Sequence, residues 1–385
     1  MDADFGESSL MYHASCPARA VTFLPWHSKV QTRVGIRSLE FVFSPLPARM
    51  RSSVVAHSMV IKESCGEVDS VLKLDYPVPL SPVPSQLSNE VELQRALVAE
   101  AAMKSRPAIG RESVLFEDEW LIIVNKPRGL YSGHVFETMP SLCSSSGETP
   151  LHLHMANRLD RDTSGIMIIT KCKVAAANLT RSYMNRKVHK TYIAQCAQSQ
   201  PTWRKSRIES GHGRSRYGAW HVYAKHDIGR RLPVKTETVR EMITRLEIVS
   251  GPDSLRWDNE LSVEHDCLEV IVGSEDEVRL VSNEVTKRCS DVDEEVTLVR
   301  AFPETGRTHQ IRLHCQYLGL PLCGDVKYGG PLFWQSVHYD SHTLHAESLA
   351  LRHPMTNQLL QVVAPYPSWA VQLGVKPFEH KTCLE

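Results

Sequence analysis

The residues with the clearest chemical potential occupy one short run, residues 156–170, which reads ANRLDRDTSGIMIIT. Two aspartates and two arginines stand together in it, directly before an apolar tetrad. A buried carboxylate stays ionised only when it is paired, and an ionised carboxylate kept from water is a strong nucleophile or base. We therefore expect Asp160 to be reactive if a distant arginine pairs with it. The alternative is an aspartate that only caps the Thr-Ser-Gly turn.

A second cluster of polar residues follows a glycine in the run TGRTHQIRLHC, residues 305–315. Four donor-bearing side chains crowd the start of an expected helix: Arg307, His309, Gln310 and Arg312. Thr308 is expected to cap that helix, because apolar residues recur after it at helical spacing. Donors beside a helix N-terminus form a site for an anion. An arginine of this cluster is the natural partner for Asp160.

Several elements are expected to position these residues. Residues 166–169 read as a buried strand, and residues 173–187 as a helix with a basic side. The run KTYIAQC alternates like a strand, with Tyr192 near its entrance. Residues 296–299 predict another strand, followed by a turn at residues 303–306.

The run SVLFEDEWLIIVNKPRGL predicts a hairpin of two strands that delivers a loop bearing Lys126. Lysine at the end of such a hairpin can contact a polyanion. The alternative is an ordinary structural hairpin whose Lys126 side chain is solvated.

Length and charge limit the class of protein. The chain has 385 residues, 42% of them hydrophobic, which is enough to bury one large core or two smaller ones. Lys+Arg and Asp+Glu both number 44, so a wholly basic nucleic-acid binder is excluded. Residues 204–240 hold ten basic and three acidic residues, whereas residues 253–295 hold four and fourteen. The first segment could bind a polyanion such as a nucleic acid, and the second would repel one.

The spacing of the cysteines and histidines does not predict a metal site. The ten cysteines include no Cys-x-x-Cys pair, which argues against a zinc ribbon or a disulfide scaffold and fits a reducing compartment. No carboxylate or cysteine pattern completes a site around the histidines His152, His154, His338, His342 and His345. No apolar run is long enough to cross a membrane. We expect a soluble intracellular protein without a bound metal.

The chain divides into four expected parts. Residues 1–75 read as a leader, either a transit segment for a chloroplast or mitochondrion or a disordered one; without import the protein would be in the cytoplasm or nucleus. Residues 76–112 read as a proline-rich linker and a short helix around residues 90–103, with ordered structure beginning near Ser113. Residues 113–367 are expected to form one folded domain that carries both polar clusters, with an acidic loop insertion at about 251–295, and residues 368–385 are expected to form a tail.

A phosphatase of the haloacid-dehalogenase class is a competing interpretation. Its nucleophile lies in Asp-x-Asp-x-Thr, but here Thr163 follows Asp162 directly. The apolar strand of that class also precedes the motif, whereas here it follows. Both departures disfavour this class.

The motifs together resemble one known family. NRLDRDTSG is similar to the His-Arg-Leu-Asp-x-x-Thr-Ser-Gly signature of RluA-type RNA pseudouridine synthases, and TGRTHQIRLHCQYLGLPLCGDVKYG to their second large motif. The hairpin run, KTYIA, LHAESLALRHP and VVAPYP resemble further family segments in the same order, from about residue 113 to 367. The proline-rich entry looks like that of plant members.

The resemblance implies an α+β pseudouridine-synthase fold: a long, bent, mostly antiparallel sheet flanked by helices, with a central RNA-binding cleft. It implies isomerisation of uridine to pseudouridine in RNA, with no metal and no cofactor. Asp160 takes the position of the catalytic aspartate, Tyr192 that of the tyrosine packed against the target base, and Arg312 that of the arginine paired with the aspartate. Arg158 matches the arginine that fills the gap left in the RNA stack. Further expected RNA contacts are Arg161, Lys126, Arg307, His309 and Gln310.

Asn157 departs from the family's usual histidine but keeps a hydrogen-bonding side chain beside the loop. No separate RNA-binding module is evident before residue 113, so we expect recognition by the catalytic domain and residues 204–240. The expected partner is ribosomal or transfer RNA, and the protein is expected to be a monomer. A homologue that binds RNA without catalysis is the alternative, but the joint presence of Asp160, Tyr192 and Arg312 favours the enzyme.

Overall fold

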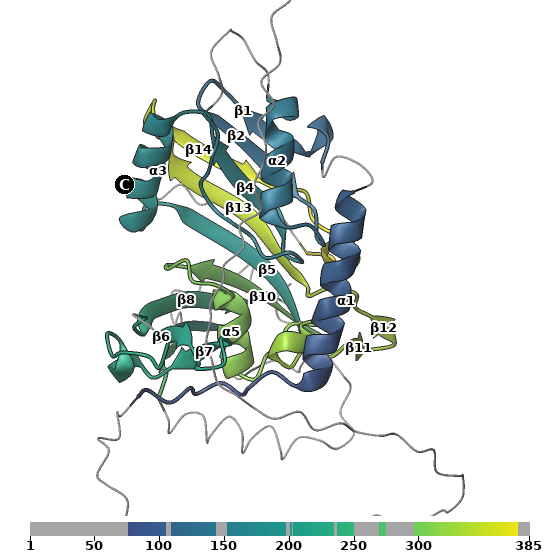
Figure 1. Ribbon diagram of the computed structural model, residues 1–385, viewed down its shortest axis with the longest axis vertical. Coiled ribbons are helices and arrows are strands. Elements are labelled where there is room, and N and C mark those ends of the chain that lie inside the picture. The colour runs from purple at the N-terminus through teal and green to yellow at the C-terminus, as the bar shows by residue number, and fades with distance from the viewer. Residues whose placement is uncertain are drawn as a thin grey trace, which may run out of the picture. The chain divides into compact units, whose positions relative to one another are not determined.

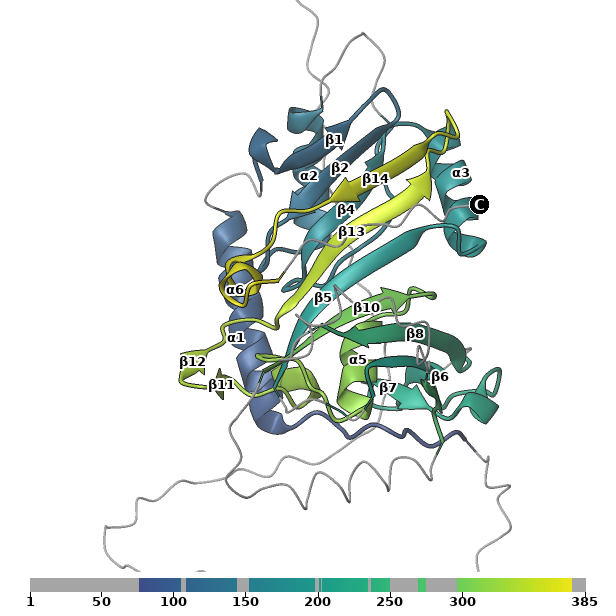
Figure 2. The ribbon, with the colours of Figure 1, turned by 180° about the vertical axis from the view of Figure 1, so that it is seen from behind.

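One large sheet organises the unit formed by residues 70–385 (Figures 1 and 2). The structure is a computed structural model that describes residues 76–104, 109–143, 152–197, 201, 203–234, 237–249, 269–274 and 296–375. The expected leader and most of the acidic segment lie outside the described residues. Within the described residues, no helix is long and apolar enough to cross a membrane.

The sheet has 12 strands, and most neighbours are antiparallel. Its strands are β1 (Val114–Glu117), β2 (Leu121–Lys126), β3 (His154–Met155), β4 (Ser164–Thr170), β5 (His189–Ala197), β6 (Lys205–Arg214), β7 (Trp220–Tyr223), β8 (Arg240–Ile248), β9 (Glu269–Val272), β10 (Val296–Pro303), β13 (Leu344–Arg352) and β14 (Leu359–Val363). The main path runs β1-β2-β4-β13-β5-β10-β8-β6-β7, with β14 on β13, β3 on β4 and β9 on β6. Only β13 with β4 and β6 with β9 pair in parallel among these described strands.

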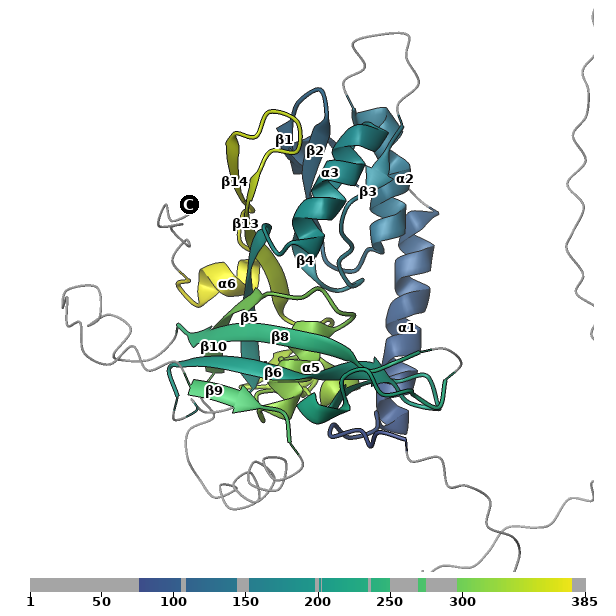
Figure 3. The same cartoon turned by 90° about the vertical axis from the view of Figure 1, so that its left-hand side faces the viewer.

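Five α-helices are described beside the sheet: α1 (Gln86–Met103), α2 (Ser132–Leu142), α3 (Lys173–Met184), α5 (Gln310–Tyr317) and α6 (Ser368–Gln372). Strands β11 (Phe333–Trp334) and β12 (Val337–His338) form a separate hairpin. Helix α6 lies on the opposite side of the sheet from α1 (Figure 3). A sheet of this kind with segregated helices is an α+β architecture, so the expected class is confirmed.

Strand β4 is buried along its whole length, as the apolar tetrad predicted. Ile166 and Ile168 pack with Leu179 of α3, whereas Met167 and Ile169 pack with Met139 of α2. Helices therefore cover both faces of this strand, and the polar run before it is fixed to a rigid base.

Gly165 is the one residue of β4 that requires glycine. Its φ is 107°, and an added Cβ would collide with the backbone oxygen of Ala346 in β13. A side chain here would push the two central strands apart. The glycine of the Thr-Ser-Gly run thus serves strand packing rather than a free turn.

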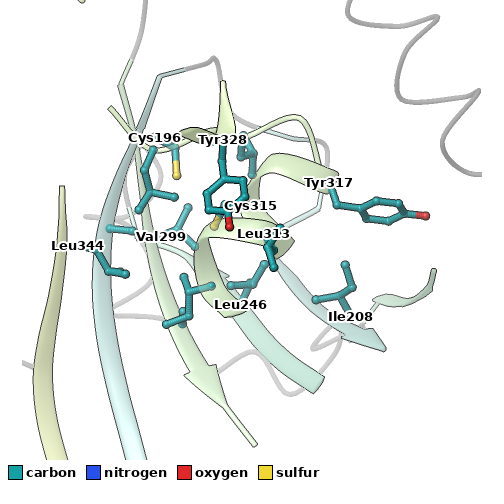
Figure 4. Packing of buried hydrophobic residues seen from close by; sticks show 14 of the residues in the cluster. Cys196, Ile208, Leu246, Val299, Leu313, Cys315, Tyr317, Tyr328 and Leu344 are labelled. Carbon is teal, nitrogen blue, oxygen red and sulfur yellow. The ribbon is translucent and has the colours of Figure 1, made fainter. Parts of the chain in front are cut away.

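A second core lies beneath α5 and fixes that helix to the other half of the sheet (Figure 4). Leu313 and Cys315 of α5 pack against Val299 of β10 and Leu246 of β8, and Tyr328 closes the same cluster. Burial of such side chains stabilises a helix by about 1.5–3 kcal/mol for each large residue. The short helix is therefore held by its apolar side, which leaves its first turn free to face the site.

Ordered structure begins earlier than residue 113, so that expectation is wrong. Residues 76–85 are extended, as the prolines predicted, but Leu80 N–H donates to Val222 O at 2.8 Å, and Ser81 lies 3.0 Å from His221 Nδ1. Helix α1 has 18 residues and starts four residues before the expected helix, with Ser85 as its N-cap. The segment is therefore docked on the sheet and is not a free linker.

Two further expectations are corrected. The acidic segment is not only a loop insertion, because Glu269–Val272 within it forms β9 and pairs with β6. The strand expected at residues 296–299 extends to Pro303 as β10, so the turn starts one residue later. In both cases the extent of the strand is set by its backbone hydrogen bonds to a neighbouring strand. The side-chain pattern of the sequence does not indicate these bonds.

Many cations of the basic segment 204–240 are already paired. Arg207 donates to Glu304 at 3.0 Å, Arg230 to Asp227 at 2.5 Å, and Lys225 contacts Glu209. Its charge excess therefore offers fewer available cations to a polyanion than the sequence count indicates.

Candidate active site

Asp160 lies in the loop between β3 and β4, and neighbouring elements hold that loop by its backbone. Ser132, the first residue of α2, donates from Oγ to Leu159 O at 2.8 Å and accepts from Leu159 N at 3.0 Å. Lys126, at the end of β2, donates from Nζ to Arg161 O at 2.9 Å. The residues on both sides of Asp160 are thus fixed by hydrogen bonds.

Arg312 connects Asp160 to a second aspartate. Its Nη1 lies 2.9 Å from Asp160 Oδ2, while Nε and Nη2 lie 2.7 Å and 2.8 Å from the two carboxylate oxygens of Asp325. Asp325 therefore takes the two-pronged interaction, which is the stronger one. Asp160 receives a single bond, so its carboxylate is charge-paired but still has oxygen lone pairs available for reaction.

These contacts determine the charge state of Asp160, whose side chain is 26% exposed. Desolvation acts to raise the pKa of Asp160, but neighbouring His309, Arg312 and His342 hold it well below its usual value. Burial lowers the pKa of His309 to about 3 and that of His342 to about 4, so both imidazoles are neutral near pH 7. Near pH 7 the permanent charge of Arg312 is therefore the cation that favours the ionised form of Asp160, and the two histidines add to this effect only at a pH low enough to protonate them.

His309 adopts an uncommon backbone conformation beside this pair. Its φ is 57°, and it stands at the N-cap of α5 without a side-chain cap, so the expected capping role of Thr308 is wrong. The His309 side chain lies 3.7 Å from Asp160 Oδ1 and 2.6 Å from the hydroxyl of Tyr328. Strained residues of this kind cost about 1–3 kcal/mol and persist when neighbours hold them. This backbone conformation places the imidazole beside the Asp160 carboxylate.

Asp160 stands where two cavities meet. The larger, of about 600 Å³, is lined by Tyr192, Tyr183, Lys190 and residues of the β10–α5 connection. The smaller, of about 500 Å³, is lined by Tyr131, Lys327, His342 and Glu92. Arg158 and Arg307 line both cavities, as does Asp160 itself. A ligand in either cavity would reach the carboxylate.

Tyr192 lies in the larger cavity with Asp160, as expected from the sequence. Burial, and then the charge of Asp160, raise the pKa of the Tyr192 hydroxyl above its usual value, so it is protonated at rest. Arg158 is exposed at the mouth of the cavity. The structure therefore brings together Asp160, Tyr192, Arg312, Arg158 and His309.

The side chains of three expected RNA contacts bond mainly within the protein, although Gln310 lines the larger cavity and Arg161 the smaller one. Lys126 is fully buried, and its Nζ donates to the carbonyls of Pro127, Leu130 and Arg161, so it is neither solvated nor open to RNA. Gln310 is 4% exposed, and its side chain bonds Thr305, Thr244 and nearby backbone. The side chain of Arg161 is 9% exposed and pairs with Asp162 and Glu92. These donors satisfy buried acceptors.

Arg307 and Asn157 bond to the backbone of the protein, and both also line a cavity. Arg307 donates from Nε to Glu241 O at 2.9 Å but still lines both cavities, so the expected RNA contact remains open to it. Asn157 accepts from Ile168 N at 2.7 Å and donates to Ile166 O at 3.3 Å. The amide thereby fixes the loop to β4.

The sequence interpretation missed Asp325. It is fully buried, and Arg312 lowers its pKa against the opposing effect of desolvation. The sequence feature that could have indicated Asp325 is the run CGDVKYG, which belongs to the same motif as Arg312 and contains one carboxylate. A buried arginine with five donors needs more than one acceptor, and this reasoning could have identified it.

Two of the five histidines named in the sequence analysis bond to hydroxyl groups of the Asp160 loop and of β4. His342 Nε2 lies 2.8 Å from Thr163 Oγ1, and His345 Nδ1 lies 2.8 Å from Ser164 Oγ. Among the residues described, no group of three or more His, Cys, Asp or Glu side chains is arranged to hold a metal ion.

Comparison with known proteins decides the family. The family model described as RNA pseudouridylate synthase matches residues 120–317. RNA pseudouridine synthase 1 of Oryza sativa subsp. japonica is 46% identical over 302 residues, which cover 77% of this chain and 84% of that protein. The chain belongs to the RNA pseudouridylate synthase family. It is thus an isomerase that acts on RNA, as the resemblance implied.

Other members of the family are also similar. RNA pseudouridine synthase 1 of Arabidopsis thaliana is 46% identical over 304 residues, covering 79% of this chain and 90% of that protein. The solved structure titled Human RNA Pseudouridylate Synthase Domain Containing 4 has 21% identity and a TM-score of 0.44, covering 73% of this chain and 95% of that one. The likeness to plant members of the RNA pseudouridylate synthase family is confirmed by the two plant proteins.

The family match includes Asp160, Tyr192 and Arg312 but not every residue of the site. Asp325 and Tyr328 lie after residue 317, where the match ends, and helix α1 lies before residue 120, where the match begins. The part of the chain that supports the ion pair is therefore broader than the matched part.

Proposed function

We propose that this RNA pseudouridine synthase uses Asp160 as its nucleophile. The observation that carries the proposal is the 2.9 Å pair between Asp160 and Arg312 at the meeting point of two cavities. A carboxylate held ionised and partly away from water needs no base to activate it. It can therefore attack a nucleotide as soon as one is placed in the cavity.

The reaction needs no net oxidation or reduction. Isomerisation breaks the bond between N1 and the ribose C1′, forms a bond between C5 and C1′, releases the C5 proton and adds a proton at N1. The electrophilic carbons that a carboxylate can attack are C1′ of the ribose and C6 of the ring, and either attack gives a covalent bond to Asp160. The target nucleotide must leave the RNA stack to reach this depth.

Tyr192 and Arg158 have proposed roles on either side of the flipped nucleotide. The ring of Tyr192 lines the larger cavity and can pack on the target base, which repays part of the cost of unstacking. We assign to its hydroxyl the late removal of the C5 proton: because the hydroxyl is protonated at rest, it gives its own proton to N1, which gains one in the reaction, and takes the proton that C5 releases. The exposed guanidinium of Arg158 can occupy the gap that the nucleotide leaves in the RNA.

The test is tritium release from RNA labelled at C5 of uridine, with ribosomal and transfer RNA as separate pools. Release by the intact protein, and none by heat-inactivated protein, is the expected result, and the active pool identifies the substrate class. RNA binding without release from either pool would contradict the proposal. It would favour a homologue that binds RNA without catalysis.

A further inference from the structure

Helix α1 contacts the residue after Asp160 and the residue before Asp325, the second partner of Arg312, although the helix precedes the residues matched by the family model. Figure 1 shows it running beside the sheet from the level of α2 to the β11–β12 hairpin. Its apolar residues Leu93, Leu97 and Val98 are 58%, 50% and 68% exposed. Much of its attachment to the domain is therefore polar.

Glu92 is the contact of α1 with the Asp160 loop. Its Oε2 accepts from Arg161 Nη2 at 2.9 Å, and its backbone oxygen accepts from Arg161 Nη1 at 3.3 Å. The same guanidinium donates to both oxygens of Asp162, at 2.8 Å and 2.7 Å. Arg161 directly follows Asp160, so fixing its side chain on one side and its carbonyl on the other restricts where the Asp160 backbone can lie.

Arg95 is the contact of α1 with the Arg312 side. Its Nη1 donates to Gly324 O at 2.9 Å and its Nη2 to Tyr339 O at 3.0 Å. Gly324 has φ 75°, and an added Cβ would collide with Ser341 O, so this backbone is tightly enclosed. Asp325 comes next and holds the guanidinium of Arg312. Arg95 thus fixes the peptide that carries the partner of Arg312.

The two contacts are joined to each other. Arg95 Nη1 lies 3.4 Å from Glu92 Oε1, one helical turn away. A continuous series of charged and polar contacts therefore runs from Asp162 through Arg161, Glu92 and Arg95 to the backbone before Asp325.

We propose that Glu92 and Arg95 are positioning residues, which hold the Asp160 loop and the Asp325–Arg312 pair at the separation that the reaction needs. The inference rests on the proposed roles of Asp160 and Arg312. Neither residue needs to touch the nucleotide for this purpose. Errors of about 1 Å in the placement of reacting groups cost up to about 100-fold in rate, so a support from outside the matched domain can control turnover.

The kinetic test compares Glu92→Gln and Arg95→Gln with the full-length wild type, and uses Glu100→Gln, on the exposed part of the same helix, as the matched control. Each positioning variant is expected to lower kcat about tenfold while KM changes less than twofold. Arg95→Lys keeps a cation and should recover part of the loss. Unchanged kcat, with only a lower melting temperature, would show a role in folding alone and overturn the proposal.

Amide hydrogen exchange in the absence of RNA separates this inference from the proposed function. Exchange at residues 157–163 and 322–328 should become faster in both positioning variants and stay unchanged in Glu100→Gln. Unchanged exchange in these segments would overturn the inference even if the wild type is active. An inactive wild type would overturn the proposed function, whereas faster exchange in the variants would still support the positioning role.

Discussion

Two arginines flank Asp160 in one loop, and their environments are opposite. Arg158 is exposed and lines both cavities, whereas the side chain of Arg161 is 9% exposed and is held by Asp162 and Glu92. The loop therefore has an open side, at the exposed Arg158 beside the cavities, and a fixed side, where Arg161 is bonded within the protein. A positive charge near the site does not by itself indicate an RNA contact.

The same division applies to the wider site. Lys126 and Arg312 belong with Arg161, since each is buried and satisfied by oxygen atoms of the protein. Arg158 and Tyr192 belong to the open side. Substitutions on the fixed side should change rate and stability, and substitutions on the open side should change binding or a single chemical step.

Arg312→Met should have the largest effect on the fixed side. It leaves two carboxylates without their cation, which should cost about 3–5 kcal/mol of stability and reduce kcat about 1000-fold. The depressed pKa of Asp160 keeps the wild-type carboxylate active until pH falls well below about 4, the usual value. Without Arg312 that pKa rises, so activity should be lost at a higher pH.

The measurement for Arg312 is the pH dependence of kcat/KM, with unfolding monitored at each pH. Arg312→Lys keeps one positive charge but not the two-pronged contact with Asp325, so its acid limb should lie between those of the wild type and Arg312→Met. An acid limb that does not move in Arg312→Met would show that another cation pairs with Asp160.

Tyr192→Phe should have the next largest effect, on the open side. The ring remains and the hydroxyl is lost, so RNA affinity should be retained while the product-forming step slows by about 100-fold. The matched control is Tyr183→Phe, because the Tyr183 hydroxyl is also buried beside this cavity and has no hydrogen-bond partner. Rapid-quench kinetics of both variants distinguish the steps. Full activity of Tyr192→Phe would exclude proton transfer by this residue.

Arg161→Met should have an intermediate effect and most directly tests the fixed side of the loop. Glu92 and Asp162 lose their shared partner, so the melting temperature should fall and kcat should drop about tenfold with little change in KM. Calorimetry and steady-state kinetics measure both quantities. A raised KM with unchanged melting temperature would instead place Arg161 on the open side.

Arg158→Met should have the smallest effect on the protein itself. Because the side chain is exposed, the melting temperature should stay the same, and KM for RNA should rise about three- to tenfold. The salt dependence of RNA affinity should become weaker if this arginine contacts a phosphate. Loss of thermal stability equal to that of Arg161→Met would contradict the division of the loop.

The sequence predicted the parts of the site that depend on local pattern. The apolar run of β4 and the alternation of β5 predicted the strand that follows Asp160 and the strand that carries Tyr192, and the need of a buried carboxylate for a cation predicted an arginine from residues 305–315 as its partner. The family resemblance selected Arg312, which lies 2.9 Å from Asp160 in the structure. The direction of each donor was not predictable in the same way. Lys126 and Gln310 point inward because unpaired carbonyls meet them there, and those carbonyls come from distant segments.

The same limit explains the missed elements. The contacts of α1 with Gly324 and Tyr339 join residues more than 200 positions apart, and the exposed apolar side of this helix gives no sequence signal of where it docks. The pairing of β9 with β6 likewise depends on backbone hydrogen bonds within a segment whose acidic composition indicates a loop. Long-range polar contacts leave little trace in periodicity.

The most direct test of the central claim is single-turnover tritium release by Asp160→Asn, with RNA affinity measured on the same preparation. Asparagine keeps the size of the side chain and removes its charge and nucleophilicity, while Arg312 retains its main partner Asp325. The account predicts RNA affinity within a few-fold of the wild type and no detectable release. A substantial rate of release by this variant would remove Asp160 from the role of nucleophile.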